Sequence, residues 1–307
     1  MLALLAPGQG SQTPGFLNPW LENGAAKELL HHWSQLIDLD LVRLGTTADA
    51  DEIRDTANAQ PLLVAGGILG ALALLESGPL PISYLAGHSV GELTAAALAG
   101  VIDSDTAMTL VRARGQEMAK AALGTETGMS AVLGGDREVV VAALAELGLT
   151  PANENGAGQI VAAGSLSALA TLADTPPAGS RVRALAVSGA FHTSTMASAL
   201  VVMTPLAASA QVSDPNIALL SNKDGAVVKS GREVLDRIVG QIAGPVRWDL
   251  CMQTLAAQGV TGVIEVPPAG TLVGLVKRAT PDIETFALKS PDDLAGAREF
   301  IAKHGGK

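Results

Sequence analysis

Residues 83–100 read SYLAGHSVGELTAAALAG, and this stretch indicates the fold. Residues 83–86 form a short apolar run that predicts a strand, and residues 90–99 have the small, apolar composition of a buried helix. Between them lies Gly-His-Ser-Val-Gly, a Gly-x-Ser-x-Gly pattern in the strand–turn–helix context of a nucleophile elbow. We therefore expect Ser89 to project its hydroxyl into a cleft. The alternative is an ordinary strand–helix turn with a capping serine.

The segments around this motif predict two different element orders. In the first part, strands are expected at 2–6 and 83–86, and helices at 60–75, 90–99 and 104–123. From 124 to 189 the pattern changes to β-α-β-β-α-β, with strands at 129–133, 150–155, 159–163 and 181–187 and helices at 136–147 and 165–173. The remaining residues predict helices near 194–210, 231–243, 248–258 and 270–279, and strands at 218–221 and 262–266.

We therefore predict an α/β protein built from two parts. The larger part, residues 1–123 and 190–307, is expected to be an α/β-hydrolase-like domain with a parallel sheet that carries the nucleophile elbow. The smaller part, residues 124–189, is expected to be an inserted ferredoxin-like subdomain.

Composition excludes several classes of function. The chain of 307 residues has 30 acidic residues against 20 Lys and Arg, and its formal charge of -10 argues against nucleic-acid binding. Aromatic residues are only 3% of the chain, so Ala, Val, Leu and Ile must form the core. The single cysteine, Cys251, excludes an internal disulfide and a cysteine-rich metal site, and it fits a reducing compartment.

The apolar stretches predict buried elements and not membrane spans. Residues 61–75 are fifteen apolar residues, fewer than the roughly 20 that a membrane helix needs. Residues 184–213 contain no charged side chain, but Gly189, His192 and Pro205 interrupt them, and we expect this run to be buried within the protein. The first six residues lack a basic region and predict a strand instead of a signal peptide. We expect a soluble, cytoplasmic protein.

A serine nucleophile needs a base, and His192 is the candidate. It lies in an uncharged stretch where the chain leaves the small subdomain, although a hydrogen-bonded core histidine is the alternative. The side chain of His88 should point away from Ser89. The other three histidines are expected at the solvated surface: His31, His32 and His304.

Arg114 is informative because it falls on the apolar face of the helix at 104–123. That face carries Ala107, Leu110, Val111, Met118 and Ala121. A buried arginine must be paired, either with a substrate carboxylate or with a buried Asp or Glu in a structural salt bridge. The Gly-rich loop at 8–12 lacks the third glycine of a dinucleotide fingerprint, and we expect it to bring a backbone N–H close to a ligand.

Taken in order along the chain, these motifs resemble the malonyl-CoA:acyl-carrier-protein transacylases of dissociated bacterial fatty-acid and polyketide synthesis. The resemblance covers almost the whole chain. The matching segments are Gly-Gln-Gly-Ser-Gln at 8–12, Gly-His-Ser-Val-Gly-Glu at 87–92, Arg-Ala-Arg-Gly at 112–115, Asn-Glu-Asn at 153–155, Gly-Gln-Ile-Val at 158–161, Gly-Ala-Phe-His at 189–192, and Gln241 before Pro-Val-Arg-Trp at 245–248. Two loops depart from the family pattern: Gly156-Ala157 replaces a Ser-Pro pair, and Pro267-Pro268-Ala269-Gly270 replaces Gly-Pro-Gly.

The resemblance implies a role for each matching residue. Ser89 would be the nucleophile and His192 the base, and the backbone N–H groups of Gln9 and Val90 would form the oxyanion hole. Arg114 would hold the malonyl carboxylate, and Gln241 would orient the histidine. Phe191 and Asn155 would line the substrate pocket, with Phe191 and Val90 favouring malonyl over methylmalonyl groups.

The implied reaction is a ping-pong transfer from malonyl-CoA to an acidic acyl carrier protein through malonyl-Ser89, by a monomer that needs no metal or redox cofactor. Because the enzyme and the carrier are both acidic, docking requires a local basic patch. Arg181 and Arg183 are the first candidates, and Lys277 and Arg278 are the second; the alternative is that all four are solvated surface charges. Two other functions compete with this one. A hydrolase would use the same elbow without an acceptor, and a non-catalytic binder would form no acyl-enzyme.

Overall fold

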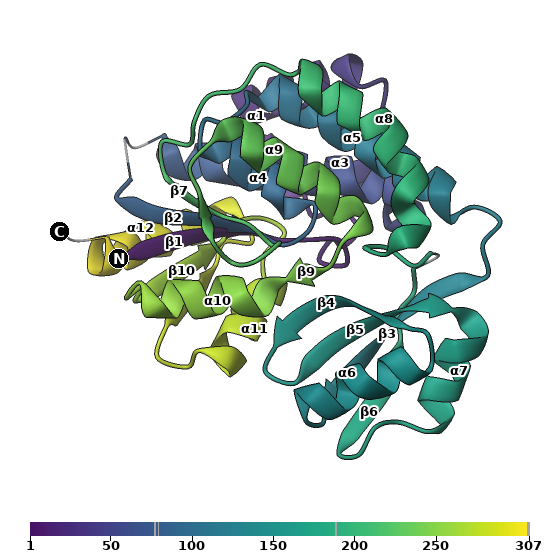
Figure 1. Cartoon of the computed structure of the whole chain (residues 1–307). Coiled ribbons are helices and arrows are strands. Elements are labelled where there is room, and N and C mark those ends of the chain that lie inside the picture. The colour runs from purple at the N-terminus through teal and green to yellow at the C-terminus, as the bar shows by residue number, and fades with distance from the viewer. Residues whose placement is uncertain (77, 79, 188, 306–307) are drawn as a thin grey trace.

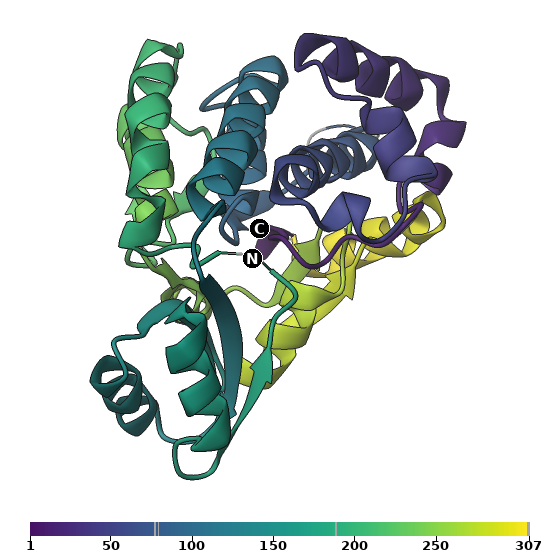
Figure 2. The same cartoon turned by 90° about the vertical axis from the view of Figure 1, so that its right-hand side faces the viewer.

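The computed structural model describes residues 1–76, 78, 80–187 and 189–305 and contains two sheets flanked by helices (Figures 1 and 2). The six strands of the larger sheet are, from edge to edge, β11 (Glu284–Ala287), β10 (Gly262–Glu265), β1 (Leu2–Ala6), β2 (Ile82–Gly87), β7 (Ala218–Leu220) and β8 (Val227–Val228). The five strands of the smaller sheet are β6 (Ser180–Ala184), β3 (Thr127–Gly134), β5 (Gln159–Ser165), β4 (Thr150–Gly156) and β9 (Val246–Arg247).

The larger sheet is parallel except at β8, which pairs antiparallel with β7. In β1 every residue is buried, and successive side chains enter different cores: Leu2 and Leu4 one, Ala3 and Leu5 the other. Side chains alternate between the two faces of a strand, and both faces of β1 are covered. The sequence of β1 is therefore a continuous apolar run instead of an alternating one.

Helices cover both faces of this sheet (Figure 1). The core on one face includes residues of α3 (Thr56–Leu75), α4 (Gly91–Leu98), α5 (Ser104–Ala122), α9 (Gly231–Gly240) and α12 (Leu294–His304). Also on that side are α1 (Gly24–Leu36), α2 (Leu41–Thr46) and α8 (Ala197–Ser209). The other face is covered by α10 (Trp248–Ala257) and α11 (Thr271–Ala279). In the smaller sheet, α6 (Arg137–Glu146) and α7 (Leu166–Asp174) pack over a separate core.

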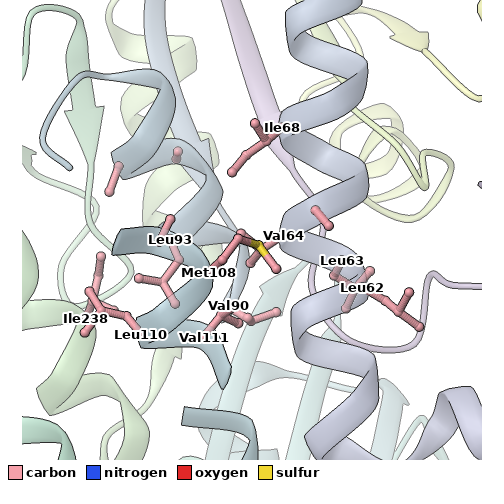
Figure 3. Close-up of a cluster of buried hydrophobic side chains, with 14 of the residues drawn as sticks. Leu62, Leu63, Val64, Ile68, Val90, Leu93, Met108, Leu110, Val111 and Ile238 are labelled. Carbon is pink, nitrogen blue, oxygen red and sulfur yellow. The ribbon is translucent and has the colours of Figure 1, made fainter. Parts of the chain in front are cut away.

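Helix α3 is the centre of the larger core. Figure 3 shows its side chains beside those of α4, α5 and α9; the labelled residues are Leu62, Leu63, Val64, Ile68, Val90, Leu93, Met108, Leu110, Val111 and Ile238. Within the described residues, α3 is the one helix long and apolar enough to cross a membrane, but 78% of its most apolar window is buried inside the protein. As expected from its glycines and its short apolar run, it is a core helix.

The smaller sheet has the predicted β-α-β-β-α-β order between residues 127 and 184, and its first four strands pair antiparallel. Its fifth strand, β9, comes from much later in the chain and pairs parallel with β4. The sequence does not predict this strand, because it is only two residues long. The pairing attaches the smaller sheet to the segment that leads into α10.

Three expectations from the sequence are wrong. The strand predicted at 181–187 ends at Ala184, because residues 185–187 leave the sheet and line cavities. His304 is buried and not solvated: its ring contacts Phe300, and Nδ1 lies 3.0 Å from Thr261 Oγ1. The uncharged run at 184–213 is not wholly buried, since α8 packs one face on α5 and α9 and leaves Val201 76% exposed. The small and hydroxyl-bearing side chains of α8 can contact water, so the exposed face of this helix needs no charged residue.

The turn at Ser89 is packed against the end of β1. A Cβ on Gly91 would lie 2.2 Å from the carbonyl oxygen of Ala6, and a Cβ on Gly87 would lie 2.0 Å from the carbonyl carbon of Gly91. These contacts are shorter than atoms tolerate, so both positions require glycine. Ser89 itself has a φ of 53°, in the left-handed region.

Substitution of Gly91 by Ala should therefore separate the elbow from β1. We expect the free energy of unfolding to fall by about 3 kcal/mol or more, because the added methyl group meets backbone and not a movable side chain. The matched control is Gly24→Ala, where a Cβ meets nothing within 4 Å, and its stability should stay within about 1 kcal/mol of wild type. Urea unfolding of both variants measures the difference; equal stability would contradict the packing argument.

Candidate active site

A cavity of about 290 Å³ lies between the two sheets, where the carboxyl ends of β1 and β2 face the smaller sheet. Parallel sheets place binding sites at this edge of their strands. Six of the residues expected at the site line the cavity: Gln9, Ser89, Val90, Asn155, Phe191 and His192. Most of the remaining lining is apolar, including Met118, Met129 and Leu275.

Ser89 and His192 form a hydrogen-bonded pair. Ser89 Oγ lies 2.8 Å from Nε2 of His192, although the two residues are 103 positions apart in the chain. The other ring nitrogen, Nδ1, lies 2.8 Å from the main-chain oxygen of Gln241. Because a carbonyl oxygen only accepts, Nδ1 carries the hydrogen and Nε2 is free to accept the serine proton.

Both members of the pair have an unusual backbone. His192 has a φ of 61°, and Ser89 also lies in the left-handed region, which residues with side chains rarely adopt. Around His192, the Thr193 hydroxyl donates to the Ala190 carbonyl at 2.7 Å, and Thr127 Oγ1 accepts from the Ala190 N–H at 3.1 Å. Strained residues persist where the surroundings over-determine them, and such strain is typical of active sites.

Burial keeps His192 neutral. Its side chain is buried, and desolvation together with the positive charge of Arg114 lowers the pKa of its imidazole from 6.5 to about 3. Desolvation disfavours the charged form of a base, and a nearby cation adds to the effect. A neutral imidazole in contact with a serine hydroxyl is ready to accept a proton.

Arg114 is buried behind the serine. Its Nη1 donates to Gln60 Oε1 at 2.6 Å, and its Nη2 reaches Gln241 Oε1 at 3.1 Å and Ser89 Oγ at 3.4 Å. Among the described residues it has no carboxylate within ion-pair distance, and its Nε has no hydrogen-bond partner. Burial lowers the pKa of this guanidinium to about 10, so it remains charged at neutral pH. The alternative for Arg114, a structural salt bridge to a buried Asp or Glu, is therefore not formed within the described residues.

The loop at residues 8–10 and the turn after Ser89 bring two backbone donors to the cavity. Gln9 and Val90 both line it, and neither N–H has a backbone or side-chain acceptor in the portion of the chain that is described. The side chain of Gln9 donates to Thr56 Oγ1 at 3.2 Å and so holds the loop against the start of α3. Two free N–H groups beside a serine hydroxyl can stabilise an oxyanion.

The smaller sheet contributes the opposite wall. Asn155 Oδ1, at the end of β4, lies 2.9 Å from Nε2 of His88, whose ring also meets the edge of Trp248. Within the described residues the His88 ring therefore bonds to Asn155 and not to Ser89, as expected, although His88 lines the same cavity. Phe191 is buried beside His192 and narrows the cavity next to the pair.

Sequence reasoning missed two polar side chains beneath the site, Glu92 and Asn222. Both are buried, and both bond to the Gln241 side chain. Burial raises the pKa of the Glu92 carboxyl to about 8, against the opposing effects of the Asn222 N–H and of Arg114. Signals for both exist: Glu92 is the single acid in an otherwise apolar helix, and Asn222 follows a predicted parallel strand.

Arg181 and Arg183 lie outside the cavity. They are exposed on β6, project from one face of the strand as predicted, and line a neighbouring groove together with Arg278. This groove shares Gln159 and Leu185 with the cavity, so it leads toward Ser89. In the described residues none of these three arginines has an ion-pair partner.

A serine hydroxyl bonded to a neutral histidine, beside free backbone donors and a buried arginine, defines a site for acyl transfer. The chain belongs to the acyl transferase domain family, whose model matches residues 5–291. Malonyl CoA-acyl carrier protein transacylase of Mycobacterium tuberculosis is 53% identical over 296 residues, covering 96% of this chain and 98% of that protein. The crystal structure of MCAT from the same organism superposes with a TM-score of 0.91 at 52% identity, covering 96% of this chain and 99% of that one.

A further solved structure includes a partner. It is described as a type II PKS acyl-carrier protein in complex with its malonyl-transacylase. It matches with a TM-score of 0.92 at 29% identity and covers 97% of this chain and 99% of that one.

The lowered pKa of His192 predicts the acid side of the activity profile. The kcat/KM of acylation reports the base of the free enzyme. His192 is the residue expected in that role, and its imidazole stays neutral as the pH falls from about 7.5 to about 5.5. We expect kcat/KM for CoA release to change by less than about twofold over this range.

The same pKa has a consequence for stability. The imidazole of His192 is protonated near pH 6.5 in the unfolded chain but only near pH 3 in the folded chain. The contribution of His192 to the free energy of unfolding is therefore present above pH 6.5 and declines as the pH falls below that value. Melting temperatures should be recorded at each pH to separate the two effects. A fall in kcat/KM with a midpoint near 6.5 in folded enzyme would contradict the burial argument.

Proposed function

We propose that the chain transfers the malonyl group from malonyl-CoA to the phosphopantetheine thiol of an acyl carrier protein, through a malonyl ester on Ser89. The observation that carries this proposal is the 2.8 Å contact between Ser89 Oγ and His192 Nε2 in a chain of this family. The names of its relatives, and the complex of one of them with an acyl-carrier protein, support the choice of donor and acceptor.

In the first half-reaction, His192 Nε2 takes the proton from Ser89 Oγ while that oxygen attacks the thioester carbonyl. The carbonyl oxygen becomes an oxyanion, and the free N–H groups of Gln9 and Val90 stabilise it. The C–S bond then breaks, the coenzyme A sulfur leaves and takes the proton from the imidazolium, and malonyl-Ser89 remains. The Gln241 carbonyl stabilises the imidazolium through Nδ1–H, in the place that a carboxylate has in many serine enzymes.

The second half-reaction reverses these steps with a different thiol. The phosphopantetheine sulfur gives its proton to His192 and attacks the ester carbonyl. The bond to Ser89 Oγ breaks, the oxygen recovers the proton, and the malonyl thioester leaves on the carrier. No step requires a metal ion or a redox cofactor.

Malonyl selectivity is proposed to come from Arg114 and Phe191. The guanidinium lies 3.4 Å from Ser89 Oγ and has an unused Nε–H, so a carboxylate two carbons from the reacting carbonyl can reach its charge. Phe191 presents a rigid ring beside the acyl position and opposes a methyl branch on the α-carbon. Asn155 fixes the opposite wall through its contact with His88.

We also propose the architecture and setting predicted from the sequence. The antiparallel order β6-β3-β5-β4 with two helices on one face supports a ferredoxin-like subdomain at 124–189. The parallel sheet with its nucleophile elbow supports an α/β-hydrolase-like larger domain at 1–123 and 190–307. The protein is proposed to act as a cytoplasmic monomer.

The direct test of this function is the covalent intermediate. Mixing the enzyme with malonyl-CoA without carrier should add one malonyl group to the peptide containing Ser89, and adding carrier with its phosphopantetheine arm should remove it. Intact and peptide mass spectrometry follow both steps, and Ser89→Ala is the control. Rapid loss of the adduct to water without carrier would instead indicate a hydrolase, and no adduct would indicate a binder.

Arg114→Ala should invert the substrate preference. Charged hydrogen bonds contribute about 1.5–3 kcal/mol, and a buried carboxylate without its partner costs more, so kcat/KM for malonyl-CoA should fall about 100-fold or more. Acetyl-CoA has no carboxylate, and its use should change little. Arg114→Lys keeps the charge without the fork and should rescue only in part.

Arg112→Ala, two residues away on the same helix, is the matched control and should retain the preference for malonyl-CoA. Parallel loss of both substrates in Arg114→Ala, together with a lower melting temperature, would show a structural role instead.

The carrier is proposed to dock on the arginine groove beside the cavity. The enzyme carries a formal charge of -10, so an acidic carrier is repelled over most of its surface and needs a local basic site. Arg181, Arg183 and Arg278 have no ion-pair partner among the described residues, and they line a groove of about 980 Å³ that joins the cavity. The phosphopantetheine arm could then extend from this groove to Ser89.

Reversing Arg181 and Arg183 to Glu should raise KM for the carrier by about tenfold or more, while Ser89 acylation by malonyl-CoA keeps its rate. The matched control reverses two exposed lysines elsewhere, Lys27 and Lys229, to Glu and so changes the net charge equally. Steady-state kinetics at fixed ionic strength measure both. Equal KM values in the two double variants would show that only the overall charge matters.

A further inference from the structure

The backbone of the nucleophile is held by a side chain from another strand end. Asn222, which follows β7 and is fully buried, accepts a hydrogen bond from the Ser89 N–H at 2.8 Å through Oδ1. Its Nδ2 donates to the carbonyl of Gly87 at 2.8 Å. The amide thus bonds the elbow on both sides of the serine and replaces the backbone partners that a residue in a sharp turn lacks.

The same amide is joined to the residue that orients the base. Gln241 Nε2 donates to Asn222 Oδ1 at 3.0 Å, and the main-chain oxygen of Gln241 accepts from His192 Nδ1. Asn222 Oδ1 therefore receives one hydrogen from the segment of the nucleophile and one from the segment of the base. A single oxygen links the two halves of the catalytic pair.

Glu92 completes this network from below. In the ionised form of Glu92, one carboxylate oxygen accepts the main-chain N–H of Asn222 at 2.7 Å, and the other accepts from Gln241 Nε2. With its nitrogen directed at Glu92 and Asn222, the Gln241 amide presents Oε1 to Arg114 Nη2. Two acceptors, Glu92 and Asn222 Oδ1, therefore fix the orientation of this amide, and Arg114 receives an acceptor instead of a competing donor.

The arrangement matters because no carboxylate contacts His192 in the described residues. The imidazole is oriented by the main-chain carbonyl of Gln241, in the short helical turn Gln241–Ala243. The position of this carbonyl depends on how firmly the rest of Gln241 is held. The Gln241 side chain is anchored by three groups: Glu92, Asn222 and Arg114. Displacements of about 1 Å at a catalytic group can cost about 100-fold in rate.

We propose that Asn222 and Glu92 are positioning residues with separate effects: Asn222 sets the nucleophile and its oxyanion donor for every acyl group, whereas Glu92 sets the Gln241 amide and through it the carboxylate-binding geometry of Arg114. This proposal rests on the proposed function, since it assigns these residues to acylation of Ser89.

The two roles predict different signatures in single-turnover acylation by malonyl-CoA and acetyl-CoA, measured above pH 8, where the Glu92 carboxyl is ionised. Asn222→Ala leaves the Ser89 N–H without its acceptor, and both rates should fall by about 100-fold with an unchanged ratio. Glu92→Gln has the same shape but places an NH₂ group against Gln241 Nε2 or Asn222 N–H. The Gln241 amide must then turn, and the malonyl-to-acetyl ratio should fall by about tenfold or more.

Two further variants keep the test decisive. Asn222→Asp has the same shape and keeps the acceptor for the Ser89 N–H, but it loses the hydrogen bond to the Gly87 carbonyl. It should therefore retain more activity than Asn222→Ala. If Asn222→Ala does not fold, Asn222→Asp takes its place in the test. Glu265→Gln is the matched control for Glu92→Gln, because Glu265 is also a fully buried acid but accepts from backbone N–H groups at the start of α11. It should lower the melting temperature without changing the ratio.

The outcomes separate this proposal from the one on which it rests. If wild-type enzyme forms no acyl-Ser89, the proposed function fails. If wild type is acylated but folded Asn222 variants react within about twofold of it, or if Glu92→Gln and Glu265→Gln show the same malonyl-to-acetyl ratio, the positioning roles are overturned.

Discussion

The close packing of the turn at Ser89 against the end of β1 is the constraint on which the site depends. Gly87 and Gly91 allow the backbone of β2 and α4 to approach so closely that a methyl group at either position would overlap another backbone atom. The serine is thereby forced into the left-handed region, with its hydroxyl at the cavity and its N–H available to Asn222. Both the direction of the Ser89 hydroxyl and the start of the following helix depend on these two close approaches.

Burial of polar groups gives the site its chemistry. Desolvation and the charge of Arg114 keep His192 neutral. The guanidinium itself donates to the amide oxygens of Gln60 and Gln241, and within the described residues it contacts no acid. An arginine neutralised by an internal carboxylate would have little attraction left for a substrate carboxylate. Amide oxygens accept hydrogen bonds from its two Nη atoms while leaving the positive charge in place. The acid in the vicinity, Glu92, is separated from Arg114 by Gln241.

The cavity exists because two sheets of different construction meet. The larger sheet places the elbow and the Gly-rich loop at its carboxyl edge, while the smaller sheet supplies Asn155 and the wall opposite. Strand β9 ties them together, since it pairs with β4 immediately before Trp248 begins α10. Outside the cavity, the end of β6 carries arginines with no acidic partner in the described chain, next to the route toward Ser89. The cavity and the arginine groove thus lie next to each other and share Gln159 and Leu185.

The sequence by itself predicted most elements, the elbow and the pairing of Ser89 with His192. Local periodicity reports burial, so β1, α3 and the apolar face that carries Arg114 were predictable, and motif order indicated the family. It did not predict β9, the burial of His304 or the half-exposed α8, because each depends on what packs against a short or ambiguous segment. Tertiary structure alone decided which amides complete the site. Asn222 and Glu92 lie 130 positions apart, and a hydrogen-bond network among distant residues has no sequence period, since it is set by the folded geometry in which buried polar groups must find partners.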